Sequence, residues 1–228
     1  MNWQDTGYLL AKNKYSENSA IVEFFTKKRG KVSGIIYGAT SKKLKNYLLI
    51  GNKFHINYIT KSENKLGYFN IEIDKINTPI YLENQRKLSC ICYSMNLIKI
   101  LTVENQENLN LYILIDELFD FLKNEIWINT FILWELNIFN KLGYSLNFED
   151  YVLKATKNNK DVFYLKSDTT RIIPSLLVKK NIISTDEVEL LDALKIVGDF
   201  LDKSILGPNN INPIMTRGVF INSIKKDL

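Results

Sequence analysis

Residues 19–38 read S-A-I-V-E-F-F-T-K-K-R-G-K-V-S-G-I-I-Y-G, and this stretch decides the fold of the first third of the chain. Its first eight residues are rich in β-branched and aromatic side chains, which favour a strand. Three cations and Gly30 follow, and glycine readily adopts the positive φ of a tight turn. Strand-like residues resume over 31–38. The stretch therefore predicts a β-hairpin whose turn carries Lys27, Lys28 and Arg29.

Further short strands surround this hairpin. Residues 7–12 form an apolar run before it, and residues 54–59 and 67–73 alternate apolar and polar side chains, as half-buried strands do. Residues 41–48 predict a short helix or a basic loop. Five strands in fewer than 80 residues fit a small barrel closed on itself, which leaves no exposed sheet edge.

The hydrophobic period changes after Pro79. Three helices are expected, over residues 85–101, 109–122 and 126–142. The third is apolar on nearly all sides, which predicts the central helix of a bundle. A fourth helix is expected to begin at a capping box of Ser184 and Glu187 and to end at Gly207.

We therefore predict an α+β chain with two domains. Residues 1–78 form a five-stranded barrel, and residues 79–228 form an α-helical domain. Residues 147–175 form a small irregular insertion in the second domain, with one strand-like run at 162–165.

Positive charge is concentrated in the predicted barrel. Residues 1–78 carry 13 Lys and Arg against 6 Asp and Glu, whereas residues 79–228 carry 17 against 19, and the whole chain has a net charge of +5. This asymmetry favours a polyanionic partner. The alternative is an ordinary solvated rim, since 26 of the 30 cations are Lys in a chain that is also rich in Asn and Ile.

Seven cations and one aromatic residue are the candidate nucleic-acid contacts. The cations flank turns of the predicted barrel, where they can bind a sugar-phosphate backbone. They are Lys27, Lys28, Arg29, Lys31, Lys42, Lys43 and Lys45. Tyr58 is the candidate for stacking on an unpaired base. For Tyr58, as for Tyr37, Tyr68 and Phe69, packing in the core is the alternative.

Several kinds of chemistry are not expected. The chain lacks a phosphate-binding loop motif, and it has a single His and two Cys, so we expect no enzyme, no cofactor and no metal. His55 is interpreted as a surface polar residue, and Cys90 and Cys92 as small apolar residues of a helix. Glu135 is expected to pair with a cation or to face a polar gap.

The compartment can also be predicted. The first ten residues lack the basic and apolar regions of a signal peptide. The most apolar window, residues 126–140, is shorter than the about 20 residues of a membrane span. A soluble cytoplasmic protein with reduced thiols is expected.

Motifs along the whole chain resemble those of the bacterial DNA repair protein family RecO, in its alphaproteobacterial form. The N-terminal ones are W-Q-D-T-G at residues 3–7, the hairpin at 17–38, the basic S-K-K at 41–43 and L-I-G at 49–51. The helical part carries W-E-L at 134–136 and L-G-Y at 142–144.

The resemblance implies an N-terminal OB-fold barrel and a helical C-terminal domain. It also implies a recombination mediator on the nucleoid that binds single- and double-stranded DNA and anneals complementary strands without ATP. The implied partners are RecR, the acidic, apolar-ended tail of single-strand-binding protein (SSB) and, indirectly, RecA. An apolar pocket edged with Lys or Arg is expected to receive the tail, at a place that the sequence does not specify.

The chain departs from the family pattern in one region. Many relatives hold zinc with cysteines after the L-G-Y segment, but residues 147–175 contain no Cys, so no metal is expected there. Two other functions remain open at this stage. One is an RNA-binding OB-fold factor, and the other is a protein-interaction scaffold whose lysines bind nothing.

Overall fold

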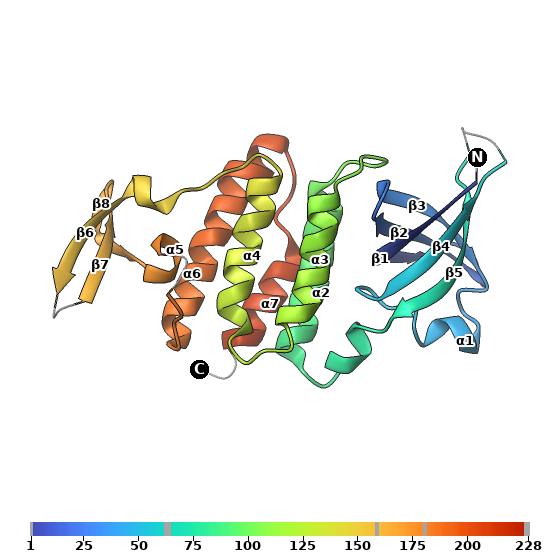
Figure 1. The fold of residues 1–228 in the computed structure, drawn as a ribbon, viewed down its shortest axis with the longest axis horizontal. Helices are drawn as coiled ribbons and strands as arrows, with labels where there is room; N and C mark the ends of the chain where they lie inside the picture. The colour runs from blue at the N-terminus through green and yellow to red at the C-terminus, as the bar shows by residue number, and fades with distance from the viewer. Residues whose placement is uncertain (1, 62–64, 158–159, 180–181, 226–228) are drawn as a thin grey trace. The chain divides into compact units, whose positions relative to one another are not determined.

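The computed structural model describes residues 2–61, 65–157, 160–179 and 182–225 (Figure 1). Contacts divide the chain into two compact units. The first unit comprises Met1–Ile113 and Ile214–Ser223, and the second comprises Leu114–Pro213 and Ile224–Leu228. A five-stranded barrel comes first in the chain and helices follow it, which confirms the predicted fold class.

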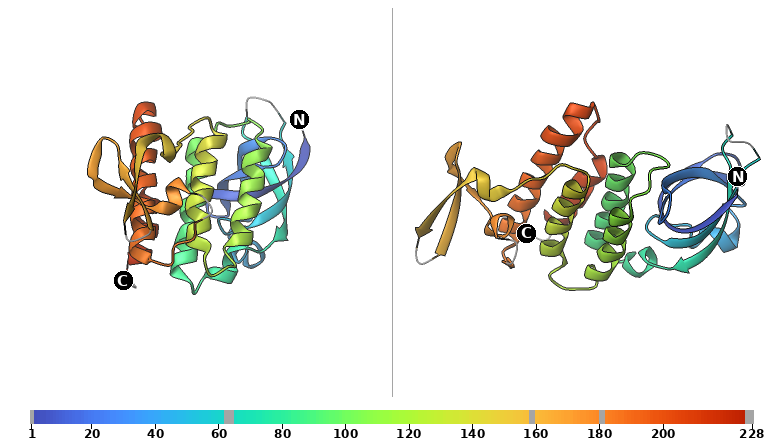
Figure 2. Two further views of the ribbon diagram at one scale, coloured as in Figure 1. Left: turned by 60° about the vertical axis from the view of Figure 1, so that its left-hand side comes forward. Right: turned by 45° about the horizontal axis from the view of Figure 1, so that its top comes forward.

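The barrel is a closed sheet with the strand order β1-β2-β3-β5-β4 (Figure 2, right). The strands are β1 (Trp3–Lys14), β2 (Ser19–Thr26), β3 (Gly30–Tyr37), β4 (Lys53–Ile59) and β5 (Tyr68–Lys75). All neighbours are antiparallel except β3 and β5, which meet in parallel where Ile35 faces Tyr68. The observed β2 has the predicted bounds, and β1 begins four residues before the predicted run.

Aromatic side chains fill the interior of the barrel. Phe24, Phe54 and Phe69 are buried, and the ring of Phe24 lies 5.6 Å from that of Phe54 and 5.2 Å from that of Phe69. Leu9 and Ile56 are also buried in this core. Burial of each side chain of this size stabilises the fold by roughly 1.5–3 kcal/mol, so this core stabilises the closed barrel.

One short helix interrupts the barrel. α1 (Lys42–Lys45) follows β3, and the Ser41 hydroxyl accepts a hydrogen bond from the N–H of Leu44 at its start. Leu44 and Tyr47 pack against the barrel core, while the three lysines of α1 are exposed. The sequence left open a helix or a loop here, and the structure shows the helix.

Helices complete the first unit. They are η1 (Thr78–Tyr81), α2 (Gln85–Leu101), residues 109–113 of α3 (Leu109–Phe121) and most of α7 (Met215–Lys225). The helix α2 has the predicted bounds, whereas α7 was not predicted. Arg217 of α7 donates a hydrogen bond to the Tyr93 hydroxyl at 2.8 Å, which fixes α7 to α2.

The second unit is built around α4 (Trp127–Lys141). Trp134 of α4 donates its Nε1–H to the carbonyl of Leu114 in α3 at 2.6 Å. On α6 (Glu187–Phe200), Phe200 lies 5.9 Å from Phe139 of α4. The helix α4 therefore contacts both neighbours, as its nearly all-round apolar sequence predicts. Among the described residues, no helix is both long and apolar enough to cross a bilayer.

The start of α6 differs from the prediction. Asp186 caps the helix by accepting the N–H of Val188 at 2.9 Å. The predicted capping box of Ser184 with Glu187 is wrong, because the Ser184 hydroxyl donates to Glu189 instead, at 2.5 Å. The helical path continues after α6 through η3 (Leu201–Leu206), a π-helix, and ends in η4 (Gly207–Asn209).

The segment predicted as an irregular insertion contains a small sheet. Its elements are η2 (Phe148–Tyr151), β6 (Val152–Lys157), β7 (Lys160–Leu165), β8 (Asp168–Ile173) and α5 (Ser175–Val178). Only the run within β7 was predicted, because Lys and Thr obscure the alternation of β6 and β8. Hydrogen bonds from Lys179 and Lys154 to the Asp161 carboxylate lower the pKa of Asp161 and join β6 and β7 to the segment after α5.

Gly30→Ala is predicted to destabilise the first unit by about 2 kcal/mol or more. A Cβ at this position would lie 1.8 Å from the carbonyl oxygen of Gln106, and the residue has φ +64°. Gly38→Ala is the control, since Gly38 has φ +71° but no atom within 4 Å of its Cβ position, so it carries only a strain of about 1 kcal/mol. The measurement is urea unfolding of both variants. If Gly30→Ala and Gly38→Ala lower the free energy of unfolding equally, the 102–108 segment does not pack on Gly30 of β3.

Candidate nucleic-acid interface

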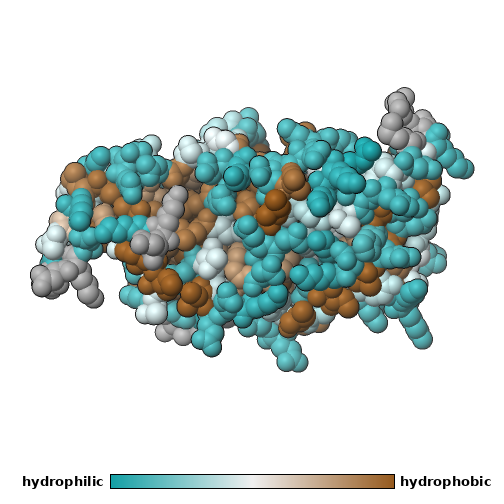
Figure 3. All heavy atoms as spheres, in the orientation of Figure 1, coloured by the Kyte–Doolittle hydropathy of each residue, from teal (hydrophilic) through white to brown (hydrophobic). Residues whose placement is uncertain are grey.

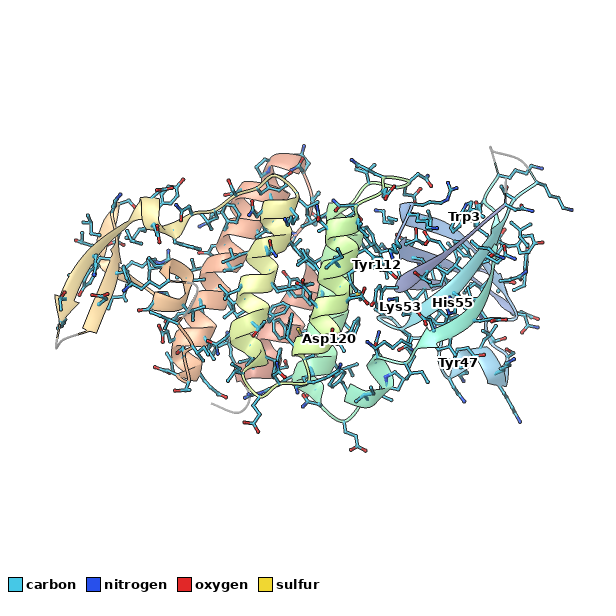
Figure 4. The ribbon with its side chains drawn as sticks, in the orientation of Figure 1. Trp3, Tyr47, Lys53, His55, Tyr112 and Asp120 are labelled. Atoms are coloured by element: carbon cyan, nitrogen blue, oxygen red, sulfur yellow. The ribbon has the colours of Figure 1, made fainter. Side chains whose placement is uncertain are left out.

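The predicted cations form two groups at opposite ends of β3. The turn cluster (Lys27, Lys28 and Arg29) precedes this strand and the helix cluster (Lys42, Lys43 and Lys45) follows it; all six side chains are exposed. The seven steps from Gly30 to Tyr37 span about 23 Å. In Figure 4, Trp3 lies on the upper side of the barrel and Tyr47, which follows α1, lies on its lower side. The structure therefore does not bring the cations together in one compact groove.

Backbone hydrogen bonds hold the turn cluster in place. The Asp5 carboxylate accepts the N–H groups of Lys28 and Thr6, both at 2.8 Å. The N–H of Lys27 donates to the carbonyl of Thr6 at 3.0 Å, and the Thr26 hydroxyl donates to the carbonyl of Gly30 at 3.1 Å. Because these bonds involve main-chain groups of the turn, its cationic side chains remain in solvent.

Lys31 differs from the other predicted contacts. Its ammonium donates to the carbonyl of Lys99 at 2.8 Å, near the C-terminal end of α2, and the side chain is half-buried. The last carbonyls of a helix lack partners within the helix and attract cations. The ammonium of Lys99 in turn lies 2.9 Å from the Glu23 carboxylate of β2. Lys31 therefore holds α2 against the barrel.

The turn cluster ends in a stack of side chains. The guanidinium of Arg29 lies 5.1 Å from the centre of the Trp3 ring, and Trp3 stacks on Tyr58 at 4.9 Å with 21° between the ring planes. Tyr58 in turn lies 5.1 Å from Phe69 of the core. The exposed end of this stack is a cation lying on an indole ring, a surface on which unpaired bases can stack.

Tyr58 lies on the core side of the stack, between Trp3 and Phe69. Its hydroxyl accepts the N–H of Gly67 at 2.9 Å, and its ring lies against the Trp3 ring, so little of the Tyr58 face is available. Sequence reasoning missed Trp3 as a candidate because it precedes the predicted strand. Extending the alternation of Gly7 and Leu9 back to residue 3 would have placed Trp3 on the inner face.

A second aromatic pair lies near the helix cluster. Tyr37, the last residue of β3, is 61% exposed, and its ring lies 5.9 Å from that of Tyr68. Phe69, by contrast, is buried in the core. Of the four aromatics singled out in the sequence, Tyr37 has the most accessible ring, and it stands five residues before Lys42.

The remaining candidates have structural surroundings. His55 is exposed, with Nε2 3.4 Å from Asp74, and Glu135 is buried on α4. Cys90 is buried, and burial raises the pKa of the half-buried Cys92 thiol. Within the described ranges, no three His, Cys, Asp or Glu side chains are grouped so as to hold a metal ion.

Comparison with known sequences decides the family. The signature described as "Recombination protein O N terminal" matches residues 1–75, and that described as "Recombination protein O C terminal" matches residues 82–210. The chain belongs to the recombination protein O family. The two matches meet between β5 and α2, whereas the contacts place α2 in the same unit as the barrel. The predicted domain boundary at residue 78 therefore stays a prediction.

Curated relatives agree with this family. The chain is 25% identical to the DNA repair protein RecO of Ruegeria sp. over 99% of both chains. It is 24% identical to that of Caulobacter vibrioides over 92% of both, and 21% identical to that of Rhodospirillum centenum over 99% of this chain and 96% of the relative. These alphaproteobacterial relatives confirm the resemblance stated from the sequence.

Lys31→Met is predicted to lower the free energy of unfolding by about 1 kcal/mol, because the carbonyl of Lys99 loses a charge-assisted hydrogen bond. Lys28→Met is the matched control, since the Lys28 side chain is exposed and only its backbone N–H is bound by Asp5. The measurement is urea unfolding of both variants. If Lys31→Met unfolds like Lys28→Met, the side chain of Lys31 does not hold α2 in solution.

Proposed function

We propose that this chain is a recombination mediator, not an enzyme, that binds single- and double-stranded DNA through its barrel and promotes pairing of complementary strands. The observation that carries the proposal is the turn cluster, in which three exposed cations adjoin the Arg29–Trp3–Tyr58 stack. Cations bind the phosphates of either kind of DNA, and the stack suits unpaired bases. Membership of a family of DNA repair proteins supports DNA as the ligand.

The proposed mechanism is electrostatic. Two DNA strands repel each other through their phosphates, and neutralising some of these charges lowers the cost of bringing the strands together. The turn cluster precedes and the helix cluster follows β3, which is about 23 Å long, and this arrangement suits contacts to several phosphates of one strand or to two strands at once. If about five phosphates of a single strand are neutralised, log affinity falls against log salt with a slope of roughly −3.5.

Charge reversal of the turn cluster (K27E/K28E/R29E) is predicted to lower affinity for single-stranded DNA at least roughly tenfold at low salt and to flatten the salt slope by about 2. Reversal of the helix cluster (K42E/K43E/K45E) has a similar effect. The matched control reverses three exposed lysines of the second unit, Lys123, Lys141 and Lys195, and so changes the net charge equally. Unchanged binding by both barrel variants in fluorescence anisotropy would refute the proposal.

We further propose that the protein acts in the cytoplasm, on the nucleoid, together with RecR. In this role it helps RecA to load onto DNA coated with SSB, whose acidic, apolar-ended tail it binds. A pocket of about 340 Å³ in the second unit supports the last point. Phe148, Ile173 and Phe200 contribute apolar walls, and Arg171 and Lys203 contribute cations.

The cations of this tail pocket are available to an incoming carboxylate. Arg171 lies 3.6 Å and Lys203 4.0 Å from the same Asp199 carboxylate, and all three side chains are about half exposed or more. Long ion pairs in solvent are worth little, so a carboxylate of the tail can compete with Asp199. The apolar walls then receive the apolar end of the tail.

Arg171→Glu combined with Lys203→Glu is predicted to weaken binding of an SSB tail peptide roughly tenfold or more, because two attractive charges become repulsive. Asp199→Asn has the opposite effect, since it frees both cations. Lys141→Glu with Lys195→Glu, which do not line the pocket, is the control. Equal peptide affinities of the two double variants would show that the tail binds elsewhere.

The whole proposal is tested by annealing of complementary strands coated with SSB. The wild-type protein accelerates annealing without ATP, and the turn-cluster variant does not. Competition with RNA of the same sequence distinguishes a DNA mediator from an RNA-binding factor. A scaffold without nucleic-acid affinity would show no retention on single-stranded DNA at any salt concentration.

A further inference from the structure

A pocket of about 280 Å³ opens beside the Trp3–Tyr58 stack. Residues from five separate parts of the first unit line it, and Val32 and Ser33 of β3 are among them. Trp3 and Tyr58 come from β1 and β4, Leu66 and Lys65 precede β5, and Glu104 and Asn105 follow α2. The volume is slightly below the roughly 300–1,000 Å³ of pockets for drug-sized ligands, so it suits a single heterocyclic ring system.

The walls of the pocket select a flat, partly apolar ligand. Trp3, Tyr58 and Leu66, which is 48% exposed, form the apolar part of the lining. Trp3 is fixed by the stack on Tyr58, and Tyr58 is fixed by its hydrogen bond from Gly67. These walls therefore exist before a ligand arrives, which reduces the entropy lost on binding.

The carboxylate of Glu104 is a hydrogen-bond acceptor on the polar side of the pocket. Oε1 of Glu104 accepts a hydrogen bond from the Ser33 hydroxyl of β3 at 2.5 Å, and the N–H of the adjacent Asn105 donates to the carbonyl of Lys31 at 2.8 Å. Both bonds fix the 104–105 segment against the barrel. A carboxylate repels phosphate but accepts N–H donors, so the pocket suits a neutral ring that carries an amino group.

Two cations lie at the edge of the pocket, where they can contact the phosphate of a bound nucleotide. Lys65 is exposed at the pocket, and Arg29 lies on the Trp3 ring that forms one of its walls. A nucleotide whose base enters the pocket thus keeps its phosphate outside, near the turn cluster. The base meets a carboxylate acceptor inside the pocket, and the phosphate meets cations outside it. This combination fits a nucleotide better than it fits an acidic or a basic peptide.

We propose that this pocket takes one base of a bound single strand and prefers a base with an exocyclic amino group, such as cytosine, over thymine. The proposal rests on the proposed DNA binding and adds base selectivity to it. Glu104 is the residue that sets the preference, because a carboxylate accepts a hydrogen bond from the amino group of cytosine. Thymine offers a carbonyl at the same place and donates no hydrogen bond to the carboxylate there.

The test compares the affinities of the full-length protein for oligo-dC and oligo-dT of 12 nucleotides, at pH 8 and constant salt. One hydrogen bond of this kind predicts tighter binding of oligo-dC by roughly 3- to 10-fold. Glu104→Gln is expected to bring this ratio close to one, because an amide can donate to thymine as well as accept from cytosine. Ser33 can still donate to the amide oxygen, so the fold is retained.

Glu107→Gln is the matched control. It removes the same charge from the same exposed segment but does not line the pocket, so it shifts both affinities equally and leaves the ratio unchanged. Two results would contradict the proposed base selectivity while leaving DNA binding intact. One is equal affinity of the wild type for oligo-dC and oligo-dT, and the other is an affinity ratio that Glu104→Gln does not change. If neither oligonucleotide binds at low salt, the proposed function itself fails.

Discussion

The contact between Gly34 of β3 and the ring of Phe69 is the constraint on which the rest of the first unit depends. A Cβ at position 34 would lie 2.4 Å from this ring, so only glycine lets β3 come close enough to β5 to close the barrel. The two strands are paired through one residue pair, Ile35 and Tyr68. The buried ring of Phe69 adds a packing contact between β5 and β3 at Gly34. The antiparallel pairing of β1 with β2, in which Gly7 faces Thr26, brings the turn after β2 beside the first residues of β1, where Arg29 meets Trp3.

The cations of the barrel have two different tasks in this arrangement. Lys31 and Lys53 are half-buried and make contacts within the first unit, Lys31 at the end of α2 and Lys53 over the rings of Tyr8 and Tyr112. The lysines of the turn and helix clusters extend into solvent. The face shown in Figure 3 is mostly hydrophilic with scattered apolar patches. A charge count alone therefore overstates the charge available to a ligand, and the positions of the side chains decide which cations can reach phosphates.

Local patterns in the sequence predicted much of the fold. The dense β-branched and aromatic run of β2 and the periodic residues of α2 gave correct bounds, because each pattern is determined by neighbours along the chain. The small sheet β6–β8 and the cap of α6 were missed or wrong, because charged residues obscure the first and Asp186 competes with Ser184 for the second.

The candidate site was predicted only in part. The sequence predicts the cations as DNA contacts, which stays a prediction, and the placement of the turn and helix clusters at opposite ends of β3 follows from the folded barrel. The role of Lys31 depends on Lys99, 68 residues later, and the pocket beside Trp3 depends on Glu104. Contacts at such separations leave no periodic signal in one sequence.

The most direct measurement of the central claim, that the barrel binds the strand, is ultraviolet cross-linking of single-stranded DNA to the intact protein, followed by mapping of the modified peptides. If the barrel binds the strand, cross-links form at the aromatic side chains around the turn and helix clusters, at Trp3, Tyr37 and Tyr68. Cross-links confined to residues 114–213 would contradict it, since they would place the DNA on the second unit.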